Sequence, residues 1–220
     1  MPRRTASRAV ENSVRRLGFG RVAGVDEVGR GCLAGPVVVA AVVLDPSRPI
    51  AGIRDSKLLS SNARERFYDR ILTSAVAWSL SVAQPDEIDR VNVHQASLFA
   101  MRDAVTQLVP LPDFVLVDGF PIPGLMVAQR AIVGGDRRCA SIAAASILAK
   151  VTRDRDMCAL HARDPRYGFD RHKGYATAQH LAAVSRFGYS EAHRQSFRPR
   201  SLFDRIDGPD DYVSGGADKR

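Results

Sequence analysis

One run of residues limits the folds open to this chain more than any other. Val37 to Leu44 reads VVVAAVVL, without a charged or polar side chain. β-Branched residues favour extended backbone, and an apolar run of this length is typical of a buried strand. Gly35-Pro36 precedes the run and Pro46 follows it. It is the longest apolar run and falls far short of the ~20 residues of a membrane helix, so no membrane segment is expected.

Other segments supply partners for this strand. Further strands are expected at residues 21–27, 76–82, 114–118 and 127–133. Helices are expected at residues 63–72, 92–108, 141–161 and 177–187, with another helical region opening at Pro85-Asp86. Gly188 stands where it would end the last helix. Three early strands followed by alternating helices and strands predict an α/β fold with a mixed sheet.

The length of 220 residues suits one domain. We expect a basic arm at residues 1–20, a single domain at 21–204 and a flexible tail at 205–220. The arm lacks the apolar stretch of a secretory signal. The three cysteines fit neither a disulfide framework nor a zinc site, so a cytoplasmic location is expected.

Charge indicates the kind of partner. The formal net charge of +8 favours a polyanion, either nucleic acid or an anionic membrane surface. A solvated basic surface without a partner would give the same number. Only four of the 32 basic residues are lysines, at positions 57, 150, 173 and 219. They mark places where a compact ammonium is needed, unless base composition alone explains the bias toward Arg.

Four acids stand at the ends of expected strands or beside glycine: Asp26, Glu27, Asp118 and Asp136. Clustered carboxylates without Cys or His suit Mg²⁺ or Mn²⁺, and two such ions would make a phosphodiester-cleaving site. An Asp beside Gly can equally be an ordinary turn residue. Adjacent residues of a regular strand point to opposite faces, so Asp26 and Glu27 can share a site only where the strand ends or bulges.

Gly29-Arg30-Gly31 follows the first acidic pair. A dinucleotide-binding loop would lead into a helix, but Gly35-Pro36 and a strand come next, and the chain has no Gly-Lys-Ser/Thr phosphate loop. We expect these glycines to let the backbone approach a ligand closely, with Arg30 reaching a phosphate.

The order of these motifs resembles the ribonuclease HII family. The blocks that carry the resemblance are VDEVGRG at 25–31, GPVV at 35–38, DSK at 55–57, EIDRVN at 87–92, VDG at 117–119, GD at 135–136, SIAAASILAKVTRD at 141–154, YGF at 167–169, HKGY at 172–175, HR at 193–194 and SF at 196–197. They span roughly residues 20–200 in long ordered blocks, so the likeness is specific. The arm and the tail lie outside it.

The resemblance implies a ribonuclease H-like fold, which is a five-stranded mixed β-sheet flanked by helices, with a C-terminal helical extension. It implies an endonuclease that hydrolyses the RNA strand of RNA–DNA hybrids and nicks 5′ to single ribonucleotides in duplex DNA. Such an enzyme leaves 3′-hydroxyl and 5′-phosphate ends and serves DNA replication and repair. Its partners are these nucleic acids and no membrane, and the chain is expected to be a monomer.

The resemblance also assigns residues. The family's metal-binding and catalytic acids match Asp26, Glu27, Asp118 and Asp136, which would bind two Mg²⁺ or Mn²⁺ ions when substrate is present. The backbone of Gly29, Arg30 and Gly31 would read the ribose 2′-hydroxyl, the group that distinguishes RNA from DNA. The ring of Tyr175 would contact the deoxyribose on the 3′ side; taken alone, it could be an ordinary surface aromatic.

Three lysines, two histidines and several departures complete the comparison of motifs. Lys57, Lys150 and Lys173 lie inside the blocks and are expected to contact phosphates, although Lys150 suits an ordinary helix surface equally well. His172 and His193 suit structural hydrogen bonds better than proton transfer. The chain departs from the family pattern at Leu58, Arg137, Arg138, Cys139 and Gln195. These departures bear on phosphate binding and remove no metal ligand.

Two other functions stay open from the sequence. A different nuclease of the ribonuclease H-like fold, such as an integrase, resolvase or exonuclease, would also cluster acids on a similar sheet. It would lack the adjacent Asp-Glu with Gly-Arg-Gly and would need no 2′-hydroxyl. A hybrid-binding module without catalysis is the second alternative, and the presence of all four acids argues against it.

Overall fold

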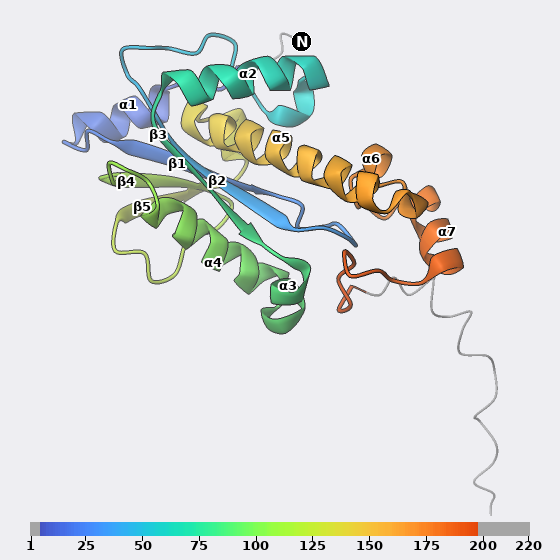
Figure 1. Cartoon of the computed structure of the whole chain (residues 1–220). Coiled ribbons are helices and arrows are strands. Elements are labelled where there is room, and N and C mark those ends of the chain that lie inside the picture. The colour runs from blue at the N-terminus through green and yellow to red at the C-terminus, as the bar shows by residue number, and fades with distance from the viewer. Residues whose placement is uncertain (1–4, 198–220) are drawn as a thin grey trace, which may run out of the picture.

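A five-stranded mixed sheet forms the centre of the structure, a computed structural model that describes residues 5–197 (Figure 1). The strands lie in the order β3-β2-β1-β4-β5. Their bounds are β1 Val22–Val28, β2 Val37–Leu44, β3 Ala75–Ala83, β4 Phe114–Asp118 and β5 Ala128–Ile132. β1 pairs antiparallel with β2 and parallel with β4. The five strands and the mixed sheet predicted from the sequence are confirmed.

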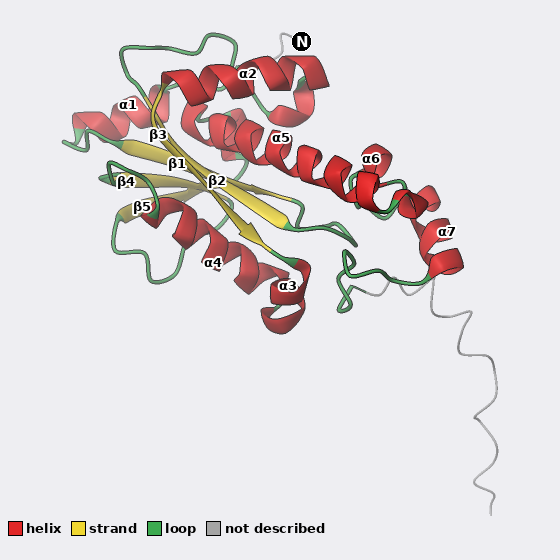
Figure 2. Ribbon diagram, in the orientation of Figure 1, coloured by secondary structure: helices red, strands yellow, loops and turns green. Residues whose placement is uncertain are grey.

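Helices cover both faces of the sheet (Figure 2). Helix α5 (Ala140–Arg163) and α2 (Ser61–Ser74) lie on one face, and α4 (Val93–Thr106) with the short α3 (Pro85–Val91) lies on the other. Alternate residues of β2 enter different cores, because Val38 and Ala40 pack with α5 whereas Val39 and Ala41 pack with α4. The apolar run is therefore buried along its whole length, on both sides.

Asn92 separates two of the helices. Its backbone has a φ of 68°, which ends α3, and its side-chain oxygen accepts hydrogen bonds from the N–H groups of His94 and Gln95 at the start of α4. This is a helix N-cap, in which a side chain satisfies backbone donors that the helix leaves free. The helical region expected from Pro85 and the helix expected at residues 92–108 are thus two separate helices that meet at this residue.

The N-terminal segment packs onto the domain. Helix α1 (Ala9–Arg16) buries Val14, and Oε1 of the buried Glu11 accepts from the N–H (2.8 Å) and hydroxyl (2.9 Å) of Ser141 in the first turn of α5. A carboxylate at this position satisfies free helix donors and interacts favourably with the helix dipole. Ser7 also pairs with Cys139. The segment expected as a basic arm is, from residue 5 onward, joined to the start of α5, whereas the expected tail lies outside the described residues.

The C-terminal helical extension predicted from the sequence follows α5. It contains α6 (Phe169–His172) and α7 (Ala178–Phe187), preceded by the short 3₁₀ helix η3 (Pro165–Tyr167). Their apolar residues form a separate small core with the far end of α5: Ala34, Met157, Tyr167, Phe169 and Val184. No helix in residues 5–197 is long and apolar enough to cross a membrane.

Candidate active site

Asp26 and Asp118 are neighbours at one end of the sheet. β1 and β4 run parallel, and their pairing ends at Val25 and Val117, one residue before each acid. Parallel strands bring their carboxyl ends to the same edge, where α/β folds place ligand-binding groups. The charge of Asp118 accordingly acts on Asp26.

Glu27 reaches the same region from the other face of β1. Pairing with β2 is regular through Val28, so no bulge separates the two acids, and β1 ends one residue after Glu27. Asp26 lies on the α5 side, where the Ser146 hydroxyl donates to it. Glu27 Oε1 is 3.1 Å from Arg30 Nη1. Of the two arrangements that allow a shared site, the structure shows the strand that ends.

The turn after β5 brings Asp136 to this edge. Gly134 has a left-handed backbone with a φ of 64°, and the 3₁₀ helix η2 (Gly135–Arg137) follows it. The N–H of Gly135 donates to Asp118 Oδ1 at 2.7 Å, which ties the two acid-bearing segments together. Asp136 is buried, and its Oδ2 lies 3.6 Å from Nζ of the otherwise exposed Lys57.

Burial and like charge raise the pKa of three of these carboxyls. For Asp26, burial and then the charges of Glu27 and Asp118 hold the pKa well above its usual range. Burial raises the pKa of Glu27, against the opposing effect of Arg30. Burial and the charge of Asp55 raise the pKa of Asp136, against the effect of Lys57.

The same carboxylates stabilise the charged form of Lys57. Partial burial disfavours its ammonium, but Asp136, Asp55 and Asp26 outweigh that effect and raise its pKa. In the described part of the chain, Asp26 has no Lys, Arg or His within ion-pair distance. Asp26 is therefore a buried carboxylate whose charge no side chain of the described residues neutralises directly.

This donor set suits a hard divalent cation. Within residues 5–197, no three Asp, Glu, His or Cys side chains stand close enough together to hold a metal ion as they are. The carboxylates nevertheless raise one another's pKa, and a cation among them would relieve that repulsion. Oxygen ligands alone suit Mg²⁺ or Mn²⁺. Asp26, Glu27, Asp118 and Asp136 thus fit the ligand role, which stays a prediction.

The glycine segment after β1 contains two glycines in different situations. Gly29 has a φ of 98°, and a Cβ there would collide with the Arg153 side chain and the Pro36 carbonyl. The protein's own packing therefore requires glycine at this position. At Gly31 no atom lies within 4 Å of where a Cβ would stand. Packing within the protein therefore leaves room for a side chain there, and the expected close approach of a ligand at Gly31 stays a prediction.

Tyr175 lies beside the same segment. The residue is 41% exposed. Its hydroxyl is hydrogen-bonded to Cys32, and burial raises the pKa of both groups. The Arg153 guanidinium lies 6.0 Å from the ring centroid. The structure thus brings Tyr175 next to the chain that follows Gly29, Arg30 and Gly31, as the family resemblance requires.

The three lysines differ in their surroundings. Only Lys57 stands against one of the four acids. Lys150 Nζ is 2.7 Å from Asp154 Oδ1 on the same helix, which favours the helix-surface interpretation. Lys173 has a φ of 52° in the turn before Tyr175, and its ammonium donates to the carbonyl of Asp170. Phosphate contacts by these lysines stay predictions.

His172 and His193 belong to a buried cluster with His180. His180 Nε2 is 3.0 Å from His193 Nε2, and His180 Nδ1 is 2.9 Å from the Tyr175 carbonyl. His172 Nε2 is 2.7 Å from the carbonyl of Tyr167. Burial lowers the pKa of His180 and lowers that of His193 to about 4, so both are neutral near pH 7. These contacts support a structural role for the histidines.

The departures from the family pattern have different surroundings, and Arg137 contacts one of the four acids. Leu58 is exposed, and Arg137 Nε is 3.9 Å from Asp136 Oδ1. Cys139 is fully buried, and burial raises the pKa of its thiol to about 12, which disfavours the reactive thiolate. The backbone N–H of Gln195 donates to Asp89 Oδ2 at 2.7 Å.

Sequence reasoning missed three contributors to this region. Asp55, Arg153 and Arg194 stand inside the quoted blocks, but no role was assigned to them. All three are buried. Their presence in a motif was the available signal; their burial and their hydrogen bonds needed the fold.

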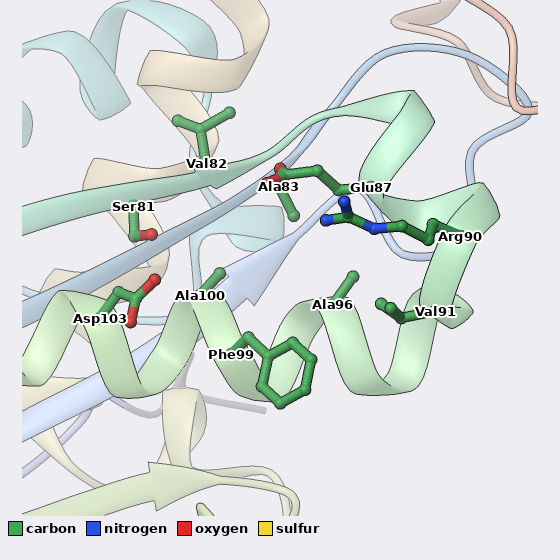
Figure 3. A pocket seen from close by; sticks show the side chains of 10 residues that line it. All are labelled: Ser81, Val82, Ala83, Glu87, Arg90, Val91, Ala96, Phe99, Ala100 and Asp103. Carbon is green, nitrogen blue, oxygen red and sulfur yellow. The ribbon is translucent and has the colours of Figure 1, made fainter.

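A separate pocket lies between β3, α3 and α4 (Figure 3). Phe99 and Asp103 of α4 face Glu87 and Arg90 of α3 across it. None of the four acids, the glycine segment or Tyr175 lines this pocket. It therefore does not belong to the candidate active site.

Comparisons with known proteins point to one family. The family model described as Ribonuclease HII matches residues 23–200. A ribonuclease HII of Burkholderia pseudomallei (strain 1710b) is 55% identical over 186 residues, covering 84% of this chain and 87% of the relative. The crystal structure of ribonuclease H2 from Pyrococcus horikoshii OT3 is similar, with a TM-score of 0.72 and 25% identity, covering 85% of this chain and 99% of that one.

A structure of Bst-RNase HIII in complex with Mn²⁺ shares the fold. Its TM-score is 0.67 at 22% identity, covering 88% of this chain and 72% of that one. These likenesses confirm the ribonuclease H-like fold predicted from the motifs.

Proposed function

Because the chain belongs to the ribonuclease HII family and is a nuclease, we propose that it cuts the RNA strand of RNA–DNA hybrids and nicks duplex DNA on the 5′ side of single ribonucleotides. The products carry 3′-hydroxyl and 5′-phosphate ends. The observation that carries the proposal is the continuity of the site: Asp26 and Glu27 lead directly into Gly29–Gly31, and Cys32 contacts Tyr175. Groups suited to phosphodiester hydrolysis and groups suited to sugar recognition therefore adjoin.

The acids have the role of metal ligands. Asp26, Glu27, Asp118 and Asp136 would hold two divalent cations, Mg²⁺ or Mn²⁺, when substrate is bound. Such ions supply charge that activates water and stabilises the leaving 3′ oxygen of an in-line displacement. The Gly135 N–H holds the Asp118 carboxylate, and Ser146 holds that of Asp26, so both are oriented before substrate arrives.

Recognition of the ribose falls to the backbone. The open space at Gly31 lets a sugar come close enough for backbone groups to hydrogen-bond its 2′-hydroxyl. Arg30 is held near Glu27, where its guanidinium can meet a phosphate of the same strand. The exposed face of Tyr175 offers a flat surface to the neighbouring deoxyribose, and an added 2′-hydroxyl there would fit less well.

The decisive experiment uses the full chain, Mg²⁺ and a DNA duplex with one ribonucleotide, with mapping of the cut ends. We expect a single nick 5′ to the ribonucleotide. Asp118→Asn should abolish cleavage and leave duplex binding largely intact, since the substitution removes charge without changing shape. An all-DNA duplex is the control.

Each failure has its own meaning. Cutting of the all-DNA duplex would indicate another nuclease of this fold. Cleavage by Asp118→Asn at the wild-type rate would contradict the metal-ligand assignment. Binding without any cleavage by the wild-type chain would favour the non-catalytic module.

A further inference from the structure

Two arginines are completely buried behind the glycine segment. Arg153 lies on α5 and Arg194 lies beyond α7, and both are 0% exposed. No carboxylate of the described residues is within ion-pair distance of either one. A buried cation is strongly disfavoured unless hydrogen bonds replace its hydration. These two side chains must therefore find that replacement in neutral acceptors.

Backbone carbonyls provide all of these acceptors. Arg153 donates to Pro36 (2.8 Å), Lys173 (2.8 Å) and Ala34 (3.0 Å). Arg194 uses its Nη2 for Gly29 (2.7 Å) and Gly35 (2.9 Å), its Nη1 for Arg30 (2.9 Å), and its Nε for Gly35 (3.1 Å). Every nitrogen of both guanidinium groups is thus used.

The acceptors belong to three pieces of chain. Arg194 joins the glycine segment, through Gly29 and Arg30, to residues 34–36. Arg153 joins residues 34–36 to the turn that carries Tyr175, through the carbonyl of Lys173. Gly29 has no room for a Cβ because Arg153 stands against it. The two arginines therefore fix the place of the glycine segment relative to the tyrosine turn.

Only a guanidinium can make this connection. Its donors lie in one plane at fixed angles, so holding several carbonyls also fixes their relative positions. A lysine ammonium in the same space keeps the charge but is a point donor on a flexible stem. Arg→Lys at either position would loosen the geometry without removing the positive charge.

We propose that Arg153 and Arg194 are positioning residues for substrate selection: they set the spacing between the backbone at Gly29–Gly31 and the ring of Tyr175, so that a ribose and its 3′ deoxyribose neighbour are recognised together. The inference rests on the proposed function. Arg194 orders the ribose-reading segment itself. Arg153 acts on selection through Tyr175, because its Nη1 donates to the Lys173 carbonyl in the turn before that residue and its guanidinium lies 6.0 Å from the Tyr175 ring centroid.

A ratio of activities tests this role. The measured quantity is kcat/KM on a duplex with one ribonucleotide divided by kcat/KM on a continuous RNA–DNA hybrid, which has no deoxyribose on the 3′ side of the cut. Loss of folded protein lowers both activities by the same factor and leaves the ratio unchanged. The ratio therefore separates positioning from a general effect on stability.

We expect Arg153→Lys to lower this ratio about tenfold in the full chain with Mg²⁺. Arg194→Lys should lower both activities about tenfold or more at unchanged folded fraction, checked by circular dichroism. The matched control is Arg155→Lys on the same helix, an exposed residue paired with Glu65, which should change neither value. Tyr167→Phe, which loses a bond to the Gly188 carbonyl away from the two segments, controls for stability.

A double-mutant cycle makes the inference specific. In the Tyr175→Ala background, Arg153→Lys should produce no further change of the ratio, because the residue through which it acts is gone. An unchanged ratio in folded Arg153→Lys, or an additive effect in the double variant, would overturn the inference. If the wild-type chain cuts neither substrate, the proposed function fails instead.

Discussion

Two regions of this molecule bury charge in opposite ways. At the carboxyl ends of β1 and β4, Asp26 is buried beside other carboxylates, and no cation of the described residues pairs with it. Behind the glycine segment, Arg153 and Arg194 are more deeply buried still, yet each has hydrogen-bond acceptors for all of its nitrogens. Both regions carry a desolvation penalty. Hydrogen bonds from Ser146 and the Glu27 N–H offset only part of it at Asp26, whose pKa stays raised, whereas every guanidinium nitrogen of the two arginines has an acceptor.

The difference indicates two roles for buried charge in this protein. Carboxylates that repel one another keep part of their interaction energy free for a cation and a phosphate that arrive later. Arginines in which every guanidinium nitrogen donates to a backbone carbonyl hold the backbone around them in one arrangement. We propose that the first region binds a cation and reacts, and that the second keeps the recognising segments in place.

The largest effect is expected when the charge of Asp26 is removed, which tests the account of the acidic region. Asp26→Asn should lower kcat by at least about 10³-fold, because a metal ligand contributes several kcal/mol to the transition state. The same variant should be about 1–2 kcal/mol more stable than wild type in EDTA at pH 8. Urea unfolding and single-turnover kinetics measure the two effects.

The pH dependence follows from the sign of the shift. The folded state holds the Asp26 proton more tightly than the unfolded chain, so stability falls as pH rises from about 4 through the raised pKa. Asp26→Asn should flatten this fall, and Mg²⁺ should reduce it in wild type. A variant less stable than wild type in EDTA at every pH would contradict the account of this region.

Arg194→Met should lower the stability of the folded protein, the opposite of the effect expected for Asp26→Asn in EDTA. Truncation leaves the carbonyls of Gly29, Arg30 and Gly35 without their donors in a buried place. We expect a loss of about 3–5 kcal/mol in the free energy of unfolding, with or without Mg²⁺. Arg186→Met, an exposed residue of α7, is the control and should change stability by less than about 0.5 kcal/mol. Stability equal to wild type would show that these carbonyls find other donors.

Acid should weaken the second region through His193. Its pKa is lowered to about 4 by burial, whereas an unfolded histidine titrates near 6.5. The unfolded state therefore takes up a proton first, and about 3 kcal/mol of stability is lost as pH falls from 6.5 to 4. The free energies of unfolding of wild type and His193→Gln, plotted against pH, should converge between pH 7 and 4.5. Exposed His94→Gln should follow wild type. Parallel curves for His193→Gln and wild type would argue against this.

Lys57 should give the smallest effect and sharpen the description of the acidic region. Lys57→Ala removes the lysine that, among residues 5–197, stands against Asp136. Hybrid affinity should fall by about 1 kcal/mol and the slope of log K against log salt by about one, as for a single phosphate contact. Lys150→Ala, whose lysine is paired with Asp154, is the matched control. Unchanged affinity and slope for Lys57→Ala would show that Lys57 interacts with the acids and contacts no phosphate.

The sequence by itself determined the architecture and the family. The apolar run Val37–Leu44 required a buried strand, and the ordered motif blocks indicated the sheet, the four acids and the glycine segment. Periodicity and motif spacing are local properties of a chain, so they can be recognised without any knowledge of the fold. The same local character led to the expectation of a basic arm at residues 1–20, because charge along a sequence does not show what Glu11 caps.

Only the tertiary structure decided which charges are neutralised. Arg194 meets Gly29 across 165 positions of sequence, and Glu11 meets Ser141 across 130. Lys57 and Lys150 looked alike in their motifs, yet one faces Asp136 and the other Asp154. Desolvation and hydrogen-bond partners depend on residues distant in sequence, so no local pattern distinguishes a buried carboxylate without a cationic partner from a buried arginine whose nitrogens all have acceptors.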